Sequence, residues 1–450
     1  MKHLLYLFLV TSISMSQTIE GTWNGKLKTP SGEILILFDF VDKENNYESF
    51  LSIPQQGLEK LKASNTKFEN DSLTLVFSNY NLKYEAKFEG SKMLGKFYQN
   101  NFPLTLNLEQ GEAKLKRPQQ PLPPFNYAIE EISLFNEKEQ IELKGSFTYP
   151  KNQKKFPIVI LISGSGPQDR NGSMFGHEPY HVIADYLSSN GIGVLRYDER
   201  GVGESKGNFE TSGINEFASD VEAAINFIKS QKKFKKHPVG LIGHSIGGIV
   251  APKVAAKNKQ VDFLVLLAAP GMQGDQLMLK QKAAFEKAMG LNSMQIASGQ
   301  EIINHAYRII RGSNLEHHTL KDSIANFYVN KYQNMIPQHQ LDGLLEQVTG
   351  TEVISLIQSN PTEYLSKVHV PVLALNGSKD LQVLPENLEL IKTVLEENGN
   401  QKVKTIEFEN LNHLFQTAEK GTLSEYSLIE ETFSLNVLTE IVSWIENTVK

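Results

Sequence analysis

The sequence predicts an α/β domain, with helices on both faces of a mostly parallel sheet, preceded by a small all-β domain. From residue 129 onwards, short apolar runs alternate with amphipathic helical segments, a rhythm typical of a parallel sheet. Residues 17–111 instead hold short segments of partly alternating polarity between Asn- and Gly-containing turns, which favours antiparallel strands. With 450 residues and 40% hydrophobic content, the chain is long enough for two or three domains.

The composition excludes several kinds of chemistry. The chain has no cysteine, which removes disulfides, a Cys nucleophile, thiolate metal sites and a lipid-anchored cysteine. Its formal net charge of −6 gives no reason to expect nucleic acid as a partner. The histidines lack H-E-x-x-H or other ligand spacing, so we expect neither a metal nor a cofactor. The oligomeric state is left open.

The first residues have the pattern of an export signal. Lys2 lies at a charged start, residues 4–10 form an apolar centre, and small residues precede an expected cut at Gln17. The apolar run is too short to cross a bilayer, so we expect a signal peptide over residues 1–16 and no integral membrane segment. A buried N-terminal helix is the alternative. The prediction is a periplasmic or secreted protein.

Residues 17–111 are expected to form a meander or small barrel. Its opening, Gly21-Thr22-Trp23, resembles the G-x-W start of lipocalin-like barrels, which bind ligands. Because a single tripeptide is weak evidence, we favour an accessory domain in which Trp23 is a core residue. Residues 112–128 contain four prolines and predict an extended linker. The expected strands are 32–40, 72–77, 82–88, 92–98 and 104–108.

Residues 129–450 are expected to form one α/β domain with an inserted helical region. An antiparallel pair opens it, and the strand–helix alternation that follows stops at about residue 272 and resumes after about 365. The expected strands are 131–135, 141–148, 157–163, 192–197, 239–242, 263–268, 370–376 and 403–408. The expected helices are 179–187, 214–228, the inserted 276–289, 294–310, 320–332 and 341–357, and a closing C-terminal helix.

Ser245 is the candidate nucleophile. The stretch Gly243-His244-Ser245-Ile246-Gly247 fits G-x-S-x-G, directly after an apolar strand and before a helix. The motif needs a sharp strand-to-helix turn, and its glycines let the neighbouring backbones approach closely. A chance match is the alternative, and the strand–turn–helix context argues against it.

Asp380 and His413 are the candidate acid and base. Asp380 follows the strand 370–376, where a carboxylate would hold an imidazole in its productive tautomer. His413 follows the strand 403–408, where it would take the serine proton and return it to the leaving group. A turn-capping aspartate and a surface histidine are the alternatives. The chain order Ser, Asp, His is the one that this type of site shows.

The oxyanion hole is expected from backbone N–H groups. A tetrahedral intermediate carries negative charge on oxygen, and each preorganised donor is worth roughly 3 to 4 kcal/mol of barrier. We assign the N–H of Ile246, after the nucleophile, and one from Ser165 or Gly166 in the Gly-rich turn after the strand 157–163. The neighbouring Asp169–Arg170 and Asp198–Arg200 stretches are interpreted as structural ion pairs.

Four stretches together resemble the α/β-hydrolases over about residues 129–450. They are Gly164–Arg170, the D-x-R-G-x-G-x-S loop at 198–205, the turn at Ser245, and the late Asp380 and His413. Within that family the chain is most similar to secreted bacterial carboxylesterases with a β-rich N-terminal domain. The resemblance implies a helical cap over about 272–365 that shapes substrate preference. The first stretch departs from the H-G-G-G form of many lipases.

The predicted function is a serine carboxylester hydrolase. It would act through an acyl-enzyme on a small-molecule ester of a small or medium carboxylic acid, without metal or cofactor. A thioesterase or an acyltransferase would use the same residues. A peptidase is a further alternative, for which the sequence shows no obvious amine-binding acidic pair. A ligand-binding envelope protein with an inert hydrolase domain is the alternative outside enzymes.

Overall fold

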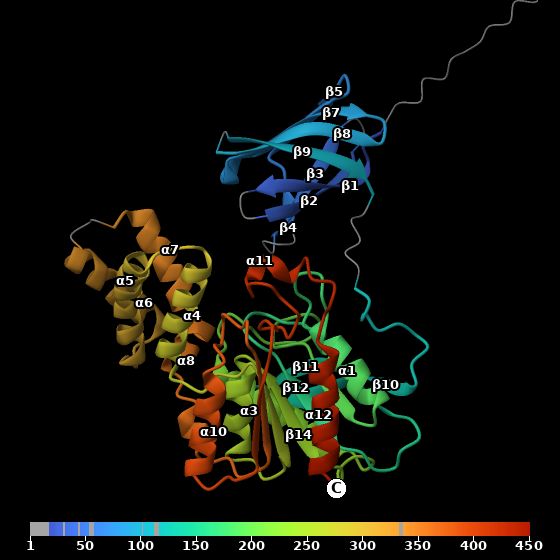
Figure 1. The fold of residues 1–450 in the computed structure, drawn as a ribbon, viewed down its shortest axis with the longest axis vertical. Helices are drawn as coiled ribbons and strands as arrows, with labels where there is room; N and C mark the ends of the chain where they lie inside the picture. The colour runs from blue at the N-terminus through green and yellow to red at the C-terminus, as the bar shows by residue number, and fades with distance from the viewer. Residues whose placement is uncertain are drawn as a thin grey trace, which may run out of the picture. The chain divides into compact units, whose positions relative to one another are not determined.

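The computed structural model describes residues 18–29, 32–43, 46–53, 58–100, 102–111, 117–332 and 336–450 (Figure 1). The chain divides into two compact units, Met1–Leu115 and Lys116–Lys450. The expected signal peptide, residues 1–16, lies outside the described residues, as do residues 112–116 of the expected linker. The rest of that linker, from residue 117, belongs to the second unit.

The first unit is an antiparallel sheet, as its sequence pattern predicts. Among its described residues, nine strands follow the order β4-β3-β2-β1-β9-β8-β7-β6-β5. Strands β1 to β4 and β5 to β9 each form a meander, β1 pairs with β9, and β4 and β5 lie at the two ends of the sheet. The strands are β1 (Gly21–Thr29), β2 (Gly32–Asp42), β3 (Tyr47–Ile53), β4 (Leu58–Lys62), β5 (Asn65–Glu69), β6 (Ser72–Phe77), β7 (Leu82–Glu89), β8 (Lys92–Gln99) and β9 (Phe102–Gln110).

Aromatic side chains fill the core of this unit. Trp23 is fully buried, donates its indole N–H to the Ile19 carbonyl at 2.8 Å, and packs edge-on against Phe88. Phe38 stacks on Tyr84, whose ring centroid is 5.1 Å away. Trp23 is therefore a core residue, because large rings occupy the space on the inner face of the sheet.

The second unit is built on an eight-stranded mixed sheet. Its order is β10-β11-β13-β12-β14-β15-β16-β17. The pairs β10/β11 and β11/β13 are antiparallel, and all pairs from β13 to β17 are parallel. The strands are β10 (Tyr127–Asn136), β11 (Ile141–Pro150), β12 (Ile158–Ile162), β13 (Gly193–Tyr197), β14 (Val239–His244), β15 (Phe263–Leu267), β16 (Val372–Gly377) and β17 (Val403–Phe408).

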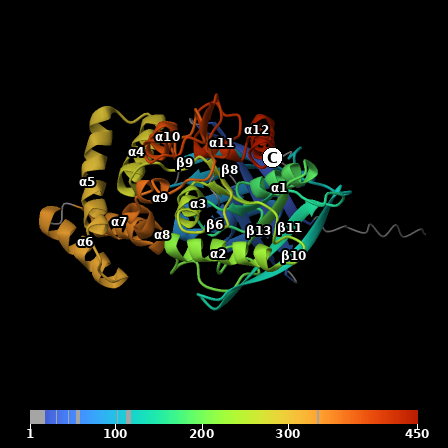
Figure 2. The same ribbon diagram turned by 90° about the horizontal axis from the view of Figure 1, so that it is seen from below.

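Helices cover both faces of this sheet (Figure 2). The helices α1 (Pro179–Ser189) and α12 (Leu435–Thr448) pack on one face, and α2 (Ile214–Ser230), α3 (Gly247–Ala255) and α10 (Asn387–Glu397) pack on the other. The short helix α11 (Leu423–Tyr426) lies before α12 in the chain. This three-layer arrangement is the predicted α/β architecture.

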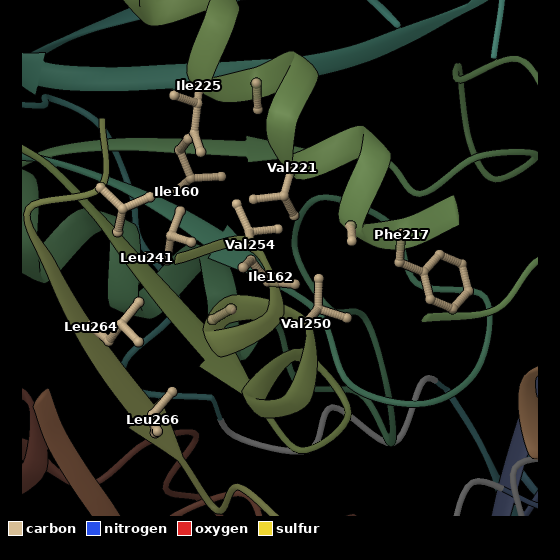
Figure 3. Close-up of a cluster of buried hydrophobic side chains, with 14 of the residues drawn as sticks. Ile160, Ile162, Phe217, Val221, Ile225, Leu241, Val250, Val254, Leu264 and Leu266 are labelled. Atoms are coloured by element: carbon tan, nitrogen blue, oxygen red, sulfur yellow. The ribbon is translucent and has the colours of Figure 1, made fainter. Parts of the chain in front are cut away.

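Strand alternation divides the core into two halves. Along β12, Ile158, Ile160 and Ile162 point into the layer of α2 and α3, whereas Val159 and Leu161 point into the layer of α1 and α12. Figure 3 shows the first layer, in which Val221 and Ile225 of α2 and Val250 and Val254 of α3 meet side chains of the sheet. β14 lies near the centre of the sheet, so the chain that leaves its carboxyl end is held by packing on both sides.

The insertion forms a helical cap with its own hydrophobic core. Between residues 272 and 365, the described part of the chain contains helices and no strand. The helices are α4 (Gly274–Ala288), α5 (Ser293–Arg311), α6 (His317–Tyr332), α7 (Gln338–Thr349), α8 (Thr351–Gln358) and α9 (Thr362–Leu365). Tyr307, Tyr328 and Val348 lie in the cap core. Figure 1 shows α4 to α8 grouped beside the sheet.

One expected helix is in fact two. The sequence pattern predicts a single helix over 341–357, but the chain leaves the helical conformation at Gly350, where φ is −59° and ψ is 140°. Glycine has a low helix propensity, so the break costs little there. The break starts α8 in a new direction and places Glu352 in its first turn.

Candidate active site

Ser245 lies on the sharp turn between β14 and α3. Its φ is +55°, in the left-handed region that residues with a side chain rarely adopt. Hydrogen bonds fix the turn on both sides: the Ser245 N–H donates to the Leu267 carbonyl at 2.9 Å, and the Gly248 N–H donates to the Ser245 carbonyl at 2.8 Å. The strained conformation therefore persists because the surrounding sheet and helix hold it.

The glycines around Ser245 are required by close backbone contacts. A Cβ at Gly243 would lie 2.1 Å from the Gly247 carbonyl oxygen. A Cβ at Gly247 would lie 2.4 Å from the carbonyl oxygen of Ile162, at the end of β12. Both distances are impossible for a real side chain, so only glycine lets the turn fold back onto the sheet.

Asp380 and His413 form a buried hydrogen-bonded pair. Asp380 follows β16 and His413 follows β17, and the Asp380 Oδ2 lies 2.8 Å from the His413 Nδ1. The other oxygen of Asp380 accepts the N–H groups of Gln382 and Val383, at 2.8 and 2.9 Å. Asp380 is completely buried. The carboxylate is thus fixed from both sides, and a carboxylate at Nδ1 directs the other ring nitrogen, Nε2, to act as the base.

His244 is the last residue of β14, directly before Ser245, and it binds the loop that carries His413. Its Nε2 donates to the His413 carbonyl at 3.0 Å, since a carbonyl only accepts, and its Nδ1 lies 3.3 Å from the Tyr180 hydroxyl. The two imidazole rings of His244 and His413 are 4.8 Å apart. Burial, together with the neighbouring His413, lowers the pKa of His244 to about 3, so this ring stays neutral and structural.

The structure thus brings Ser245 and His413 onto neighbouring loops but does not bond them. Within the described residues, the Ser245 hydroxyl makes no hydrogen bond to His413. Nucleophile–base hydrogen bonds are often long before substrate binds, so this separation is compatible with the expected roles.

The N–H groups of the Gly-rich turn differ in whether they have a hydrogen-bond partner. Gly164 donates to the Tyr180 hydroxyl at 3.1 Å, Gly166 donates to the Glu352 carboxylate at 3.1 Å, and Gln168 donates to Glu199 at 2.9 Å. Residue 167 is proline and has no N–H. Among the described residues, the N–H of Ser165 has no partner, and the same holds for Ile246.

This turn lies next to the nucleophile. A Cβ added to Gly164 would lie 3.1 Å from the Cβ of Ser245. Of the two predicted alternatives, Ser165 therefore keeps a free donor beside Ser245, whereas the Gly166 N–H is occupied by the cap.

Two carboxyl groups that hold this turn have raised pKa values. Burial, with a smaller contribution from the neighbouring Glu352, raises the pKa of Glu199 to about 8. Burial also raises the pKa of Glu352 to about 7, with a contribution from Glu210. Neither Glu199 nor Glu352 has an ion-pair partner in the described part of the chain. Glu199 is therefore mostly protonated at neutral pH, and Glu352 is about half protonated.

The other charged residues near this turn form structural ion pairs, but with partners that differ from the predicted ones: among the described residues Asp169 accepts hydrogen bonds from Asn171 and Ser173 and makes no ion pair with Arg170. The Arg170 guanidinium binds both oxygens of Asp198, at 3.0 and 2.7 Å. Arg200 binds both oxygens of Asp220, each at 2.8 Å. These bidentate pairs brace the loop after β13.

Sequence reasoning missed Glu352, Tyr180 and the distinct state of Glu199. Tyr180 has the spacing of an apolar helix face, and Glu352 has only the mark of an acidic residue in a first helical turn. Their contacts with residues 164–168 join positions up to 186 residues apart. No local pattern in the chain indicates such a contact.

Neither a metal cluster nor a membrane span is found in the described ranges. No group of three or more His, Asp or Glu side chains there is placed to hold a metal ion. None of the described helices combines the length and hydropathy needed to cross a bilayer.

A serine at a left-handed strand-to-helix turn, in a mostly parallel sheet between two helical layers, defines the α/β-hydrolase class. The family model described as serine aminopeptidase, S33, matches residues 176–419, which is more than half of the chain. The protein therefore belongs to this family of serine hydrolases.

Several known proteins are similar to the chain. Esterase EstD of Thermotoga maritima is 26% identical over 304 residues, which cover 67% of this chain but only 65% of EstD, less than two thirds of its length. An acyl transferase of Shewanella woodyi is 31% identical over 128 residues, covering 28% of this chain and 37% of the relative. The structure of the Pyrococcus furiosus esterase Pf2001 has a TM-score of 0.45 and 15% identity, covering 75% of this chain and 98% of that one.

The strained backbone at Ser245 predicts that glycine stabilises this position. We expect Ser245→Gly to raise the free energy of unfolding of the second unit by about 1 kcal/mol, because glycine adopts this φ without strain. Ser245→Ala keeps the strain and serves as the control. Thermal unfolding of both variants checks this, and equal melting temperatures would contradict it.

The raised pKa of Glu199 predicts a loss of stability at alkaline pH. Its folded-state pKa of about 8 exceeds the unfolded value, so the stabilisation is complete below about pH 4.5 and is lost as the pH rises through about 8. Between pH 5 and pH 8, the free energy of unfolding of the wild type should fall by on the order of a few kcal/mol more than that of Glu199→Gln. Urea unfolding measures this, with Glu204→Gln, an exposed carboxyl of the same loop, as control. Parallel pH slopes for wild type and Glu199→Gln would refute the assignment.

Proposed function

We propose that this protein is a serine carboxylester hydrolase. It acts through an acyl-enzyme on esters of small or medium carboxylic acids, with Ser245, His413 and Asp380 as its catalytic residues. The observation that carries the proposal is the left-handed backbone of Ser245 at the end of β14. A strained serine at this position, next to a buried Asp–His pair, is more consistent with a nucleophile than with a packing residue.

The first half-reaction forms the acyl-enzyme. The Ser245 Oγ attacks the ester carbonyl carbon while the His413 Nε2 takes its proton. The carbonyl oxygen becomes an oxyanion, which the N–H groups of Ile246 and Ser165 stabilise. The tetrahedral intermediate then collapses, the bond to the leaving alkoxide breaks, and His413 returns the proton to it as an alcohol.

The second half-reaction repeats these roles with water. His413 takes a proton from water, the hydroxide attacks the acyl carbonyl, and the same two N–H groups hold the new oxyanion. Collapse breaks the bond to Ser245 and releases the carboxylic acid, and the proton from His413 returns to the Ser245 Oγ. Asp380 stays ionised and stabilises the imidazolium in both halves.

The likeness to EstD, whose name is that of an esterase, supports an ester substrate. A thioesterase or an acyltransferase would share every step up to the acyl-enzyme, and the partial likeness to an acyl transferase keeps that alternative open. A thioesterase differs in the leaving group, which is a thiol in place of an alcohol. An acyltransferase differs in the nucleophile that attacks the acyl-enzyme, which is another acceptor in place of water.

A second candidate is an aminopeptidase, which the name of the matching family model suggests. The observation that favours it is Glu352, a cap carboxylate that binds the turn beside Ser245 and has no ion-pair partner in the described part of the chain. Such an acid could receive the ammonium group of a peptide. The sequence contains no obvious pair of this kind, because Glu352 reaches the site only through the fold.

Hydrolysis of p-nitrophenyl esters of increasing acyl length tests the proposal. The wild type should release p-nitrophenol in a burst, and Ser245→Ala should lose at least about 10⁴-fold in kcat/KM, because removal of the nucleophile leaves only the oxyanion donors. A fluorophosphonate should label the wild type at Ser245 and leave the variant unlabelled. Aminoacyl p-nitroanilides in the same assay distinguish the second candidate.

Three outcomes decide between the activities. Faster turnover of the anilides, lost in Glu352→Gln, would replace the esterase with the aminopeptidase. Acceleration by an added alcohol or thiol, with transfer of the acyl group to it, would indicate an acyltransferase. Neither turnover nor labelling would reject an active hydrolase and favour a ligand-binding envelope protein.

We also propose that the protein is exported, on the basis of the signal-like pattern of residues 1–16. Expression of the full chain in a Gram-negative host should yield a mature protein that begins at Gln17 in the periplasm or the medium. Mass spectrometry of each cell fraction measures this, with Leu7→Arg, which breaks the apolar centre, as control. An uncleaved chain in the cytoplasm would contradict the proposal.

A further inference from the structure

Arg117 holds two loops of the second unit together. Its guanidinium donates to the carbonyls of Phe175 and Gly176, at 3.1 and 2.9 Å, and to those of Ser427 and Ile429, at 2.8 and 3.0 Å. The first two carbonyls lie before α1 and the last two lie after α11, more than 250 residues further along the chain. A planar guanidinium has donors spaced for such a bridge, which a single ammonium group lacks.

Two series of contacts link the loops held by Arg117 to the candidate catalytic residues, and the first leads to Asp380. Ser427 follows Tyr426, whose hydroxyl accepts the side-chain N–H of Gln382 at 3.1 Å. The backbone N–H of Gln382 in turn donates to Asp380 Oδ1 at 2.8 Å. The position of Tyr426 thus bears on the carboxylate that binds His413.

The second series of contacts leads to the loop of His413. The ring of His177 lies 2.9 Å from the Tyr426 carbonyl, 2.9 Å from the Thr432 hydroxyl and 3.0 Å from the Gln416 amide. Gln416 and Asn412, the residue before His413, share three hydrogen bonds. The Gln416 N–H donates to Asn412 Oδ1, the Asn412 amide donates to Gln416 Oε1, and the Asn412 N–H donates to the Gln416 carbonyl. His177 and Gln416 are both almost completely buried, so these contacts lie out of water.

We propose that Arg117 is a positioning residue that keeps Asp380 and His413 in reactive geometry. This inference rests on the proposed function. The segment that leads into the second unit is then part of the support of the active site, although it contributes no group that touches the substrate. Loss of the bridge should let the two loops separate slightly, and a small misplacement of a base costs far more in rate than in binding.

Three variants test the proposal. Arg117→Ala removes the hydrogen bonds to both loops. Arg117→Lys keeps the positive charge but lacks the planar guanidinium that can bind the carbonyls of both loops at once. Gln120→Ala is the matched control: Gln120 lies three residues away and binds Glu178, before α1, at 2.6 Å, outside both series of contacts. For p-nitrophenyl acetate, kcat should fall about 10- to 100-fold in Arg117→Ala, with KM within two-fold of wild type. The kcat of Arg117→Lys should lie between those of Arg117→Ala and the wild type. Gln120→Ala should match the wild type in both kcat and KM.

A spectroscopic measurement distinguishes an effect of Arg117 on the geometry of His413 from a general loss of stability, and it does not depend on the proposed function. Proton NMR should show a downfield signal for the His413 Nδ1–H bonded to Asp380, assigned by its loss in Asp380→Asn. In Arg117→Ala this signal should shift or broaden, while the melting temperature falls no more than in Gln120→Ala. An unchanged signal with unchanged kcat, or a fall in kcat equal to that of Gln120→Ala, would overturn the proposal. An inactive wild type would reject the hydrolase function, and the NMR comparison would still decide the role of Arg117.

Discussion

The site depends on one backbone conformation, the left-handed turn at Ser245. This conformation costs free energy, so it must be imposed by the structure around it. β14 supplies the fixed end, because it pairs with β12 and β15 and is buried throughout. α3 supplies the other end, and Gly247 lets that helix touch the end of β12. A substitution that loosens this packing would free the turn, so the hydrophobic core and the chemistry of Ser245 are coupled.

The Gly-rich turn, residues 164–168, is also fixed by the structure around it, through contacts that leave the N–H of Ser165 free. Tyr180, Glu352 and Glu199 come from three different elements, and each takes an N–H of residues 164–168. Buried N–H groups without partners are costly, so their satisfaction fixes the turn. Among the N–H groups of residues 164–168, that of Ser165 alone has no partner, and Ser165 is exposed, so this donor is available to the oxyanion of the proposed reaction.

The sequence predicts the parts of this site that depend on local pattern. The alternation of strands and helices, the G-x-S-x-G turn, and an Asp and a His after successive strands are readable because each needs only a few neighbouring residues. The break at Gly350, the contact of Glu352 with Gly166, and the bridge of Arg117 are not readable in this way. The contact of Glu352 and the bridge of Arg117 each join residues far apart in the chain. The presence of a glycine at position 350 does not by itself show whether a helix breaks there or continues through it.

The two raised pKa values are caused by burial and suit the proposed chemistry. An ionised carboxylate beside the turn would oppose the oxyanion, and the arginines nearby are already engaged by Asp198 and Asp220. Protonation removes that repulsion, and burial favours it by raising the pKa of Glu199 to about 8. Glu352, with a pKa of about 7, is at the midpoint of its titration near neutral pH. It is also the one of the two that belongs to the cap, so burial in the cap, together with Glu210, favours its neutral form beside the proposed oxyanion hole.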